Sequence, residues 1–196
     1  KFDEAYINLY QATWSYAFHS AAYYLLAEID CNRGEFDKAL AHLDRSISTN
    51  SKNTKALNLM TVVLRKLGKT EEAISLNRMV LEEFPLNFWS MNENVLMGID
   101  HGNHELPVLS FSDLQDKMGD YVENYLELSL DYGNCGFWED AAEVLKLIEN
   151  TEDKAGSKNP MVYYYLAWYY YNMNDHGTTE HYLNVASNMP ADYCFP

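Results

Sequence analysis

Residues 23–85 contain one motif written twice, as YYLLAEIDCNRGEFDKALAHLDRSISTN (23–50) followed by SKNTKALNLMTVVLRKLGKTEEAISLNRMVLEEFP (51–85). Gly34 recurs as Gly68 and Ala39 recurs as Ala73, so the spacing is 34 residues at both positions. A fixed period between about 20 and 50 residues is typical of stacked repeats, each too small to bury its own apolar face. The stretch therefore predicts a stack of small, similar units.

The same spacing finds further copies on both sides of this stretch. Ala5 lies 34 residues before Ala39, and Gly136 lies 68 residues, or two periods, after Gly68. A last copy starts near Pro160 and has Asn174 in the turn where Gly is usual. By this alignment the chain begins in the second helix of a repeat whose first helix is missing, and we interpret the chain as a piece of a longer protein.

Within each repeat, large and small side chains recur at helical spacing. A large, a large and a small residue fall on one helix stripe in three copies: Tyr23–Leu26–Ala27, Tyr125–Leu128–Ser129 and Tyr163–Leu166–Ala167. The small residue lets two helices approach closely, and a turn glycine accepts the left-handed conformation that ends the first helix. Pro85 then stops the second helix. This pattern resembles the tetratricopeptide repeat (TPR), a helix–turn–helix unit of the same length.

The resemblance implies an all-α fold, a right-handed superhelical solenoid of TPR-type hairpins in one domain over residues 1–196. It places an opening half-repeat at 1–19 and repeats at about 20–53, 54–87, 88–121, 122–159 and 160–196. The repeat at 88–121 is irregular because Pro107 occupies the place of a helical Ala, so its second helix should begin near Glu105 or later. Residues 151–158 (TEDKAGSK) predict a longer loop between repeats.

The charge of the chain excludes some classes of partner. The formal net charge is −15, and residues 101–196 hold sixteen Asp and Glu against four Lys and Arg. A phosphate backbone would be repelled by this half, so nucleic-acid binding is disfavoured. No uninterrupted apolar run approaches the ~20 residues of a membrane helix, so we expect no membrane insertion. An acidic, solvated surface is the expectation.

The three cysteines carry no recognisable chemistry. Cys31, Cys135 and Cys194 form neither a close-spaced metal pattern nor an even disulfide set, and we interpret them as small buried or half-buried fillers in a reduced or cysteine-tolerant setting. This favours the cytoplasm, although localisation stays open because an address could precede Lys1.

Candidates for catalysis or metal binding are weak. His101, His104 and Glu105 resemble a metal-ligand cluster, but they lie in a turn without a fourth ligand, and a polar turn is the better interpretation. The other four histidines are scattered without a fixed partner: His19, His42, His176 and His181. No nucleophile motif or phosphate-binding glycine loop is present. We therefore predict no catalytic residue, no metal site, no cofactor and no enzymatic activity in this segment.

Aromatic residues give the main hint about function. Residues 163–171 read YYYLAWYYY, which places rings around the whole circumference of one helix. The TPR resemblance implies that one face of each first helix lines a concave groove, and the residues carried onto that face are Tyr24, Lys55, Asn58, Arg65, Trp89, Asn92, Tyr164, Trp168 and Tyr171. Tyr and Trp supply large, rigid contact area with a polar tip. These residues predict either a groove that binds a peptide or partner protein, or a surface that packs against another domain.

A narrower resemblance concerns residues 120–196. The runs YLEL (125–128), FWEDA (137–141) and ADYCFP (191–196) look like the TPR region of large bacterial proteins that carry an upstream, sugar-mutarotase-like β domain. The prediction from the whole sequence is an interaction scaffold that binds a peptide or partner domain. The alternative is an accessory helical region of a bacterial enzyme of carbohydrate metabolism, with carbohydrate as a possible ligand and catalysis placed upstream.

Overall fold

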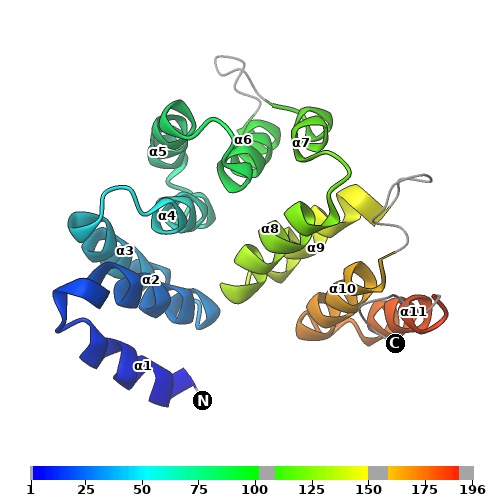
Figure 1. Ribbon diagram of the computed structural model, residues 1–196, viewed down its shortest axis with the longest axis horizontal. Coiled ribbons are helices and arrows are strands. Elements are labelled where there is room, and N and C mark those ends of the chain that lie inside the picture. The colour runs from blue at the N-terminus through cyan, green and yellow to red at the C-terminus, as the bar shows by residue number, and fades with distance from the viewer. Residues whose placement is uncertain (1, 102–108, 150–158, 190–196) are drawn as a thin grey trace. The chain divides into compact units, whose positions relative to one another are not determined.

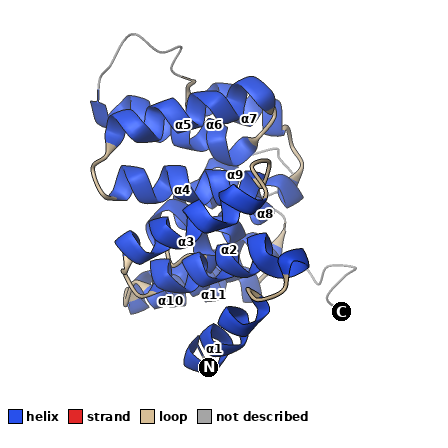
Figure 2. Ribbon diagram, turned by 90° about the vertical axis from the view of Figure 1, so that its left-hand side faces the viewer, coloured by secondary structure: helices blue, strands red, loops and turns tan. Residues whose placement is uncertain are grey.

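A computed structural model of the protein describes residues 2–101, 109–149 and 159–189, with the side chains of 99–101 left aside. Within these ranges the chain forms helices and no strand (Figures 1 and 2). The helices are α1 (Phe2–Ala12), α2 (Tyr16–Asn32), α3 (Phe36–Thr49), α4 (Thr54–Lys66), α5 (Thr70–Glu83), α6 (Phe88–His101), α7 (Phe111–Met118), α8 (Val122–Asn134), α9 (Trp138–Glu149), α10 (Pro160–Asn172) and α11 (His176–Ser187).

The helices pair in chain order, which confirms the predicted all-α solenoid of TPR-type hairpins. The four regular hairpins are α2/α3, α4/α5, α8/α9 and α10/α11, and in each the two helices pack on one another. Packing also continues from one hairpin to the next, since α3 contacts α4, α5 contacts α6 and α9 contacts α10. Each hairpin thus covers its apolar face with a neighbour, as expected for a repeat that cannot bury it alone.

The turn inside each regular hairpin has the same backbone geometry. Gly34, Gly68 and Gly136 have φ values of 71°, 72° and 79°, and Asn174 has 61°. In every turn the next residue donates its N–H to a carbonyl five residues back, at 2.8–3.1 Å. This is the bond that closes a helix end through a left-handed residue. Asn174 therefore takes the predicted glycine position, because Asn tolerates the left-handed region better than most residues do.

The small residues of the repeat are buried where the sequence predicts close helix contacts. Ala39, Ala73 and Ala141 on the second helices are completely inaccessible to solvent, as are Ala27 and Ser129 on the first helices. A larger side chain at such a point would force the helices apart. The 34-residue spacing of small residues is therefore a packing requirement.

The chain divides into two compact units, which are described separately. Unit 1 comprises residues 1–114 and contains α1 to α6, and unit 2 comprises residues 115–196 and contains α8 to α11. The boundary falls inside α7. The assignment of all 196 residues to a single domain stays a prediction.

The irregular third repeat is described in part. Its second helix, α7, starts at Phe111, where the Oγ of Ser110 accepts the N–H of Asp113 at 3.1 Å and the Asp113 carboxylate accepts the N–H of Ser110 at 2.8 Å. This reciprocal pair caps the helix start. His104, Glu105 and Pro107 of the preceding turn lie outside the described ranges, and so does the predicted loop 151–158.

Candidate interaction surfaces on the first helices

The residues that the sequence assigns to a groove all lie on the first helices of hairpins. In unit 1 these are Tyr24 on α2, then Lys55, Asn58 and Arg65 on α4, and Trp89 and Asn92 on α6. In unit 2 they are Tyr164, Trp168 and Tyr171 on α10. The two groups have different environments.

Most of the unit 1 group is buried. Tyr24 and Trp89 are 8% and 3% exposed, and Asn58 and Asn92 are 4% and 2% exposed. Lys55, at the start of α4, is exposed. Four of the six predicted contact residues in this unit therefore present almost no surface in this structure.

Asn58 belongs to a buried hydrogen-bond network between α4 and α6. Its amide nitrogen donates to the side-chain oxygen of Asn87 at 3.0 Å, and its amide oxygen accepts the hydroxyl of Ser90 at 2.7 Å. Asn77 of α5 adds a bond from its amide nitrogen to the Ser90 carbonyl at 3.0 Å. Buried polar groups need such partners, because an unsatisfied one costs about 1–3 kcal/mol.

Arg65 makes the second polar connection between the same two helices. Its Nε and Nη2 atoms donate to the two carboxylate oxygens of Glu93 at 2.7 and 2.9 Å. The side chains are only 9% and 0% exposed, so both charges are withdrawn from water. We call this pair, together with Asn58, Asn87 and Ser90, the polar seam. A two-pronged Arg–carboxylate contact fixes geometry as well as neutralising charge, so the seam sets how α4 lies against α6.

The polar seam has a structural role that the sequence does not reveal. The sequence predicts ligand contact for Asn58 and Arg65, whereas in the structure Arg65 bonds to Glu93 of α6 and Asn58 bonds to Asn87, the residue before α6. Their role in binding stays a prediction. Glu93 is the residue from which the sequence could have predicted this ion pair. The equivalent positions of the two preceding repeats hold Leu59 and Leu25, and a carboxylate at a position that is otherwise apolar needs a partner.

The unit 2 group forms an exposed aromatic strip. Tyr164, Trp168 and Tyr171 are 45%, 40% and 60% exposed, and their spacing of four and three residues puts them on one face of α10. We call these three residues the aromatic strip. It is an uncovered line of large rings along a helix whose other faces are packed.

The strip rests on a packed aromatic layer. The Trp168 ring packs edge-on against Trp138 of α9, with centroids 5.4 Å apart, and against Tyr165 at 6.1 Å. Below it Tyr169 is fully buried, and its hydroxyl donates to the Ser129 hydroxyl of α8 at 3.1 Å. Burial raises the pKa of Tyr169 far above its usual value, so the phenol stays neutral.

A second face of α10, beside the strip, is packed. Tyr163 is buried, with its ring 6.3 Å from that of Tyr182 of α11. Tyr170 is half-buried and stacks on the same ring at 5.6 Å, while Lys146 of α9 lies 5.5 Å from the centre of Tyr170. The run of aromatics therefore divides into a packed side and an exposed strip.

The prediction that the histidines lack fixed partners is wrong for two of them. His42 Nδ1 lies 2.7 Å from a carboxylate oxygen of Asp30, and Asp30 is completely buried. His19 Nδ1 lies 2.6 Å from the Thr49 hydroxyl. Both pairs join α2 to α3, and their members are 12 and 30 positions apart, so only the hairpin brings them together.

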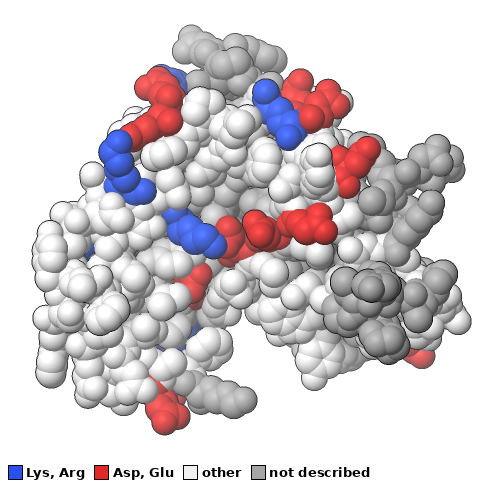
Figure 3. Space-filling model, in the orientation of Figure 1, with Lys and Arg blue, Asp and Glu red and all other residues white. Residues whose placement is uncertain are grey.

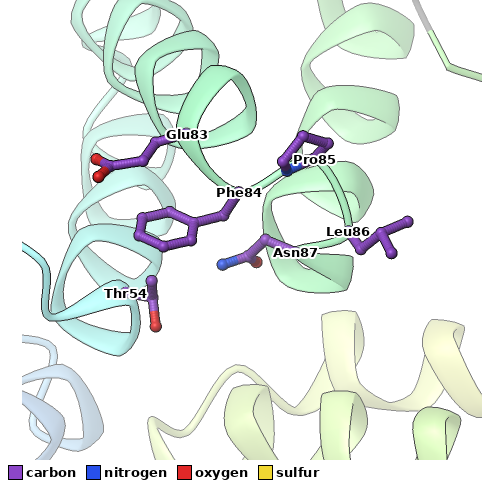
Figure 4. Close-up of a pocket in the computed structure, with 6 residues that line it drawn as sticks. All are labelled: Thr54, Glu83, Phe84, Pro85, Leu86 and Asn87. Atoms are coloured by element: carbon purple, nitrogen blue, oxygen red, sulfur yellow. The ribbon is translucent and has the colours of Figure 1, made fainter.

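One open pocket lies at the turn between α5 and α6 in unit 1 (Figure 4). Its volume is about 590 Å³. The residues that line it are Thr54, Glu83, Phe84, Pro85, Leu86 and Asn87. Glu83 pairs with Lys52, and Asn87 belongs to the polar seam. The side chains of Glu83 and Asn87 are therefore already bonded to neighbouring residues of the chain.

No metal site is found in the described part of the chain, where no group of three or more His, Cys, Asp or Glu side chains could hold an ion. Among the same residues no helix has the length and apolar character needed to cross a membrane. Cys31 and Cys135 are buried, as predicted, while Cys194 lies outside the described ranges. Burial raises the pKa of the Cys31 thiol, so the thiol stays protonated and unreactive.

Comparison with known proteins supports the fold. No protein-family model and no curated protein matches this chain. Among solved structures, YrrB, described as a TPR protein with an unusual peptide-binding site, aligns with a TM-score of 0.51 and 13% identity over 95% of this chain and 94% of its own.

Two further structures align somewhat less well. TTC0263, a TPR protein of Thermus thermophilus, has a TM-score of 0.47 and 19% identity over 89% of this chain and 93% of its own. MamA from Desulfovibrio magneticus has a TM-score of 0.48 and 17% identity over 87% of this chain and 94% of its own.

Proposed function

We propose that this chain is a non-enzymatic interaction scaffold that holds a peptide or a partner protein against the aromatic strip of α10. The observation that carries the proposal is the exposure of three adjacent large rings on a helix that is otherwise packed. Binding hot spots are enriched in Trp and Tyr, because these side chains bury much area and lose little conformational entropy.

The packing beneath the strip supports the same function. Trp168 is held by Trp138 and Tyr165, so its ring is positioned before a partner arrives. Pre-positioned side chains lower the entropic cost of binding. YrrB, a protein of the same fold, is described as having a peptide-binding site, and this supports a peptide as the ligand. The groove residues predicted in unit 1 would add contacts, with Lys55 the exposed one.

A selection experiment tests this function without a known partner. Random twelve-residue peptides displayed on phage are selected on the whole chain, and the affinity of the best peptides is measured by fluorescence anisotropy. We expect Trp168→Ala to weaken binding about tenfold or more, as for an interface anchor, with the helical circular dichroism spectrum retained. Tyr171→Ala is the second variant, because this ring is the most exposed of the three.

Two controls make the test decisive. Leu183→Ala removes a comparably exposed apolar side chain (44%) from α11 in the same unit and should leave affinity unchanged. Failure to select any peptide, or peptides that bind the strip variants as tightly as the parent, would contradict the proposal.

The alternative from the sequence, an accessory helical region of a bacterial carbohydrate-active enzyme, stays a hypothesis, and so does the cytoplasmic location. Aromatic rings can also stack on sugars, so the strip is compatible with either ligand. Where the chain continues before Lys1, short alternating strands there would favour the enzyme, and further copies of the 34-residue motif would favour the scaffold.

A further inference from the structure

We infer that the segment held by the aromatic strip is cationic and places Lys or Arg side chains over the exposed rings. This inference rests on the proposed function and specifies the chemistry of the partner. A cation over a Tyr or Trp face is attracted by the ring quadrupole, and nearby acidic groups add to the attraction.

The charge of unit 2 is the first argument. Its described residues, 115–149 and 159–189, contain eleven Asp and Glu against two Lys, which are Lys117 and Lys146. Such a field raises the local concentration of cationic partners and repels anionic ones. An acidic peptide is therefore a poor fit to this unit.

The position of the acidic residues on α8 is the second argument. When α8 is aligned on α10 through their core residues, Tyr125 matches Tyr163. Leu126 and Leu130 then match Tyr164 and Trp168. Glu127 is exposed and takes the α8 position that corresponds to Tyr165.

Two links then place α8 beside α10. Ser129 accepts the Tyr169 hydroxyl, and a Cβ on Gly133 would come within 2.8 Å of the Tyr169 ring. Figure 3 shows acidic side chains gathered over α8. Glu123 and Glu127 are exposed residues of this neighbouring helix, and we call them the acidic rim.

The chain itself shows which groups cover its tyrosines. Arg33 lies 5.0 Å from the centre of Tyr6, Arg45 lies 5.4 Å from Tyr23, and Lys146 lies 5.5 Å from Tyr170. In the described residues of unit 2, Lys146 is engaged on the packed side of α10, where Glu143 accepts its ammonium at 2.7 Å. His176 approaches the Tyr171 ring at 6.0 Å, which leaves Tyr164 and Trp168 for a partner's cations.

The peptide selection described above tests this inference through the composition of the selected peptides. We expect enrichment of Lys and Arg and depletion of Asp and Glu relative to the unselected library. The double variant Glu123→Gln/Glu127→Gln should weaken a selected peptide about three- to tenfold at low salt, as expected for two exposed charge pairs. Raising the salt concentration to about 0.5 M should reduce the difference, because screening acts on exposed charges.

A matched control separates local from overall charge. The double variant Glu139→Gln/Glu180→Gln removes the same charge from exposed positions of α9 and α11 and should weaken binding less than about twofold. Equal losses in the two double variants would overturn the local acidic rim.

The two proposals fail in different ways. Peptides that need Trp168 and Tyr171 but show no enrichment in Lys and Arg would overturn the cationic partner and leave the scaffold function standing. No selected peptide, or peptides indifferent to both strip variants, would overturn both. Replacing each Lys and Arg of a selected peptide by Gln provides the reciprocal test, with loss of binding to the parent chain as the expected result.

Discussion

The first helices of the two units place side chains at the same repeat positions and use them differently. In unit 1, Asn58 and Arg65 bond to partners in or next to α6, within the polar seam. In unit 2, the residues at the corresponding positions of α10, Tyr164 and Tyr171, are 45% and 60% exposed. A residue on this face is therefore available for a partner only where neighbouring helices do not need it.

The difference follows from the chemistry of the side chains. An Asn or Arg buried between helices must be hydrogen-bonded, so each such residue fixes one partner and one geometry. Aromatic rings pack without such a requirement, and a surface layer of rings can rest on a buried one, as Trp168 does on Tyr169 with centroids 5.3 Å apart. The seam favours a fixed orientation of helices, and the strip favours binding.

The largest effect is expected from breaking the seam. Arg65→Ala leaves the Glu93 carboxylate buried without its guanidinium partner, and removing one member of a buried ion pair costs about 3–5 kcal/mol. Urea unfolding followed by circular dichroism measures the loss. The double variant Arg65→Met/Glu93→Leu should lose less than the single one, and a double variant as unstable as Arg65→Ala would contradict this account.

The next effect concerns the layer beneath the strip. Gly133→Ala puts a methyl group 2.8 Å from the Tyr169 ring, and such overpacking costs about 1–3 kcal/mol of unfolding free energy. Gly177→Ala in α11 is the control, because its Cβ would meet nothing closer than 3.7 Å and Ala favours the helix by up to about 1 kcal/mol. Equal midpoints in urea for the two variants would show that α8 and α10 are not in tight contact at Gly133.

The hairpin turns give a smaller effect of opposite sign in the two units. Gly68→Ala should cost about 1 kcal/mol, because the residue keeps φ at 72° and an L side chain is strained there. Asn174→Gly should stabilise by a few tenths of a kcal/mol, up to about 1, since glycine suits the φ of 61° without strain. Thermal unfolding of both variants checks the signs, and a stabilising Gly68→Ala would be incompatible with the turn.

The smallest effect is expected in the strip itself. Tyr171→Ser removes a ring that is 60% exposed and should change the free energy of unfolding by less than about 0.5 kcal/mol. Tyr169→Ala, two residues away and fully buried, should cost about 3–5 kcal/mol. If the two variants are equally unstable in urea, Tyr171 is a core residue and the strip is not a free surface.

The fold was predictable from the sequence, and the environment of the site residues was not. Gly34 and Gly68, one repeat period apart, indicate the turns of two hairpins, because the backbone conformation at a turn depends on the residues of the turn itself. The local sequence does not identify Glu93 and Ser90 as the partners of Arg65 and Asn58, since those contacts join residues 28 and 32 positions apart. Nothing in the local pattern separates a groove Asn from one that bonds the next helix.

By itself the sequence determined the repeat, its period, the helices and the small residues at their contacts, because turn conformation and helix periodicity are local properties that recur with every copy. Only the tertiary structure decided that Trp89 is 3% exposed and Trp168 40% exposed, although both stand on the first helix of a repeat. The reason is physical: exposure depends on which neighbouring side chains cover a residue, and those neighbours come from distant parts of the chain.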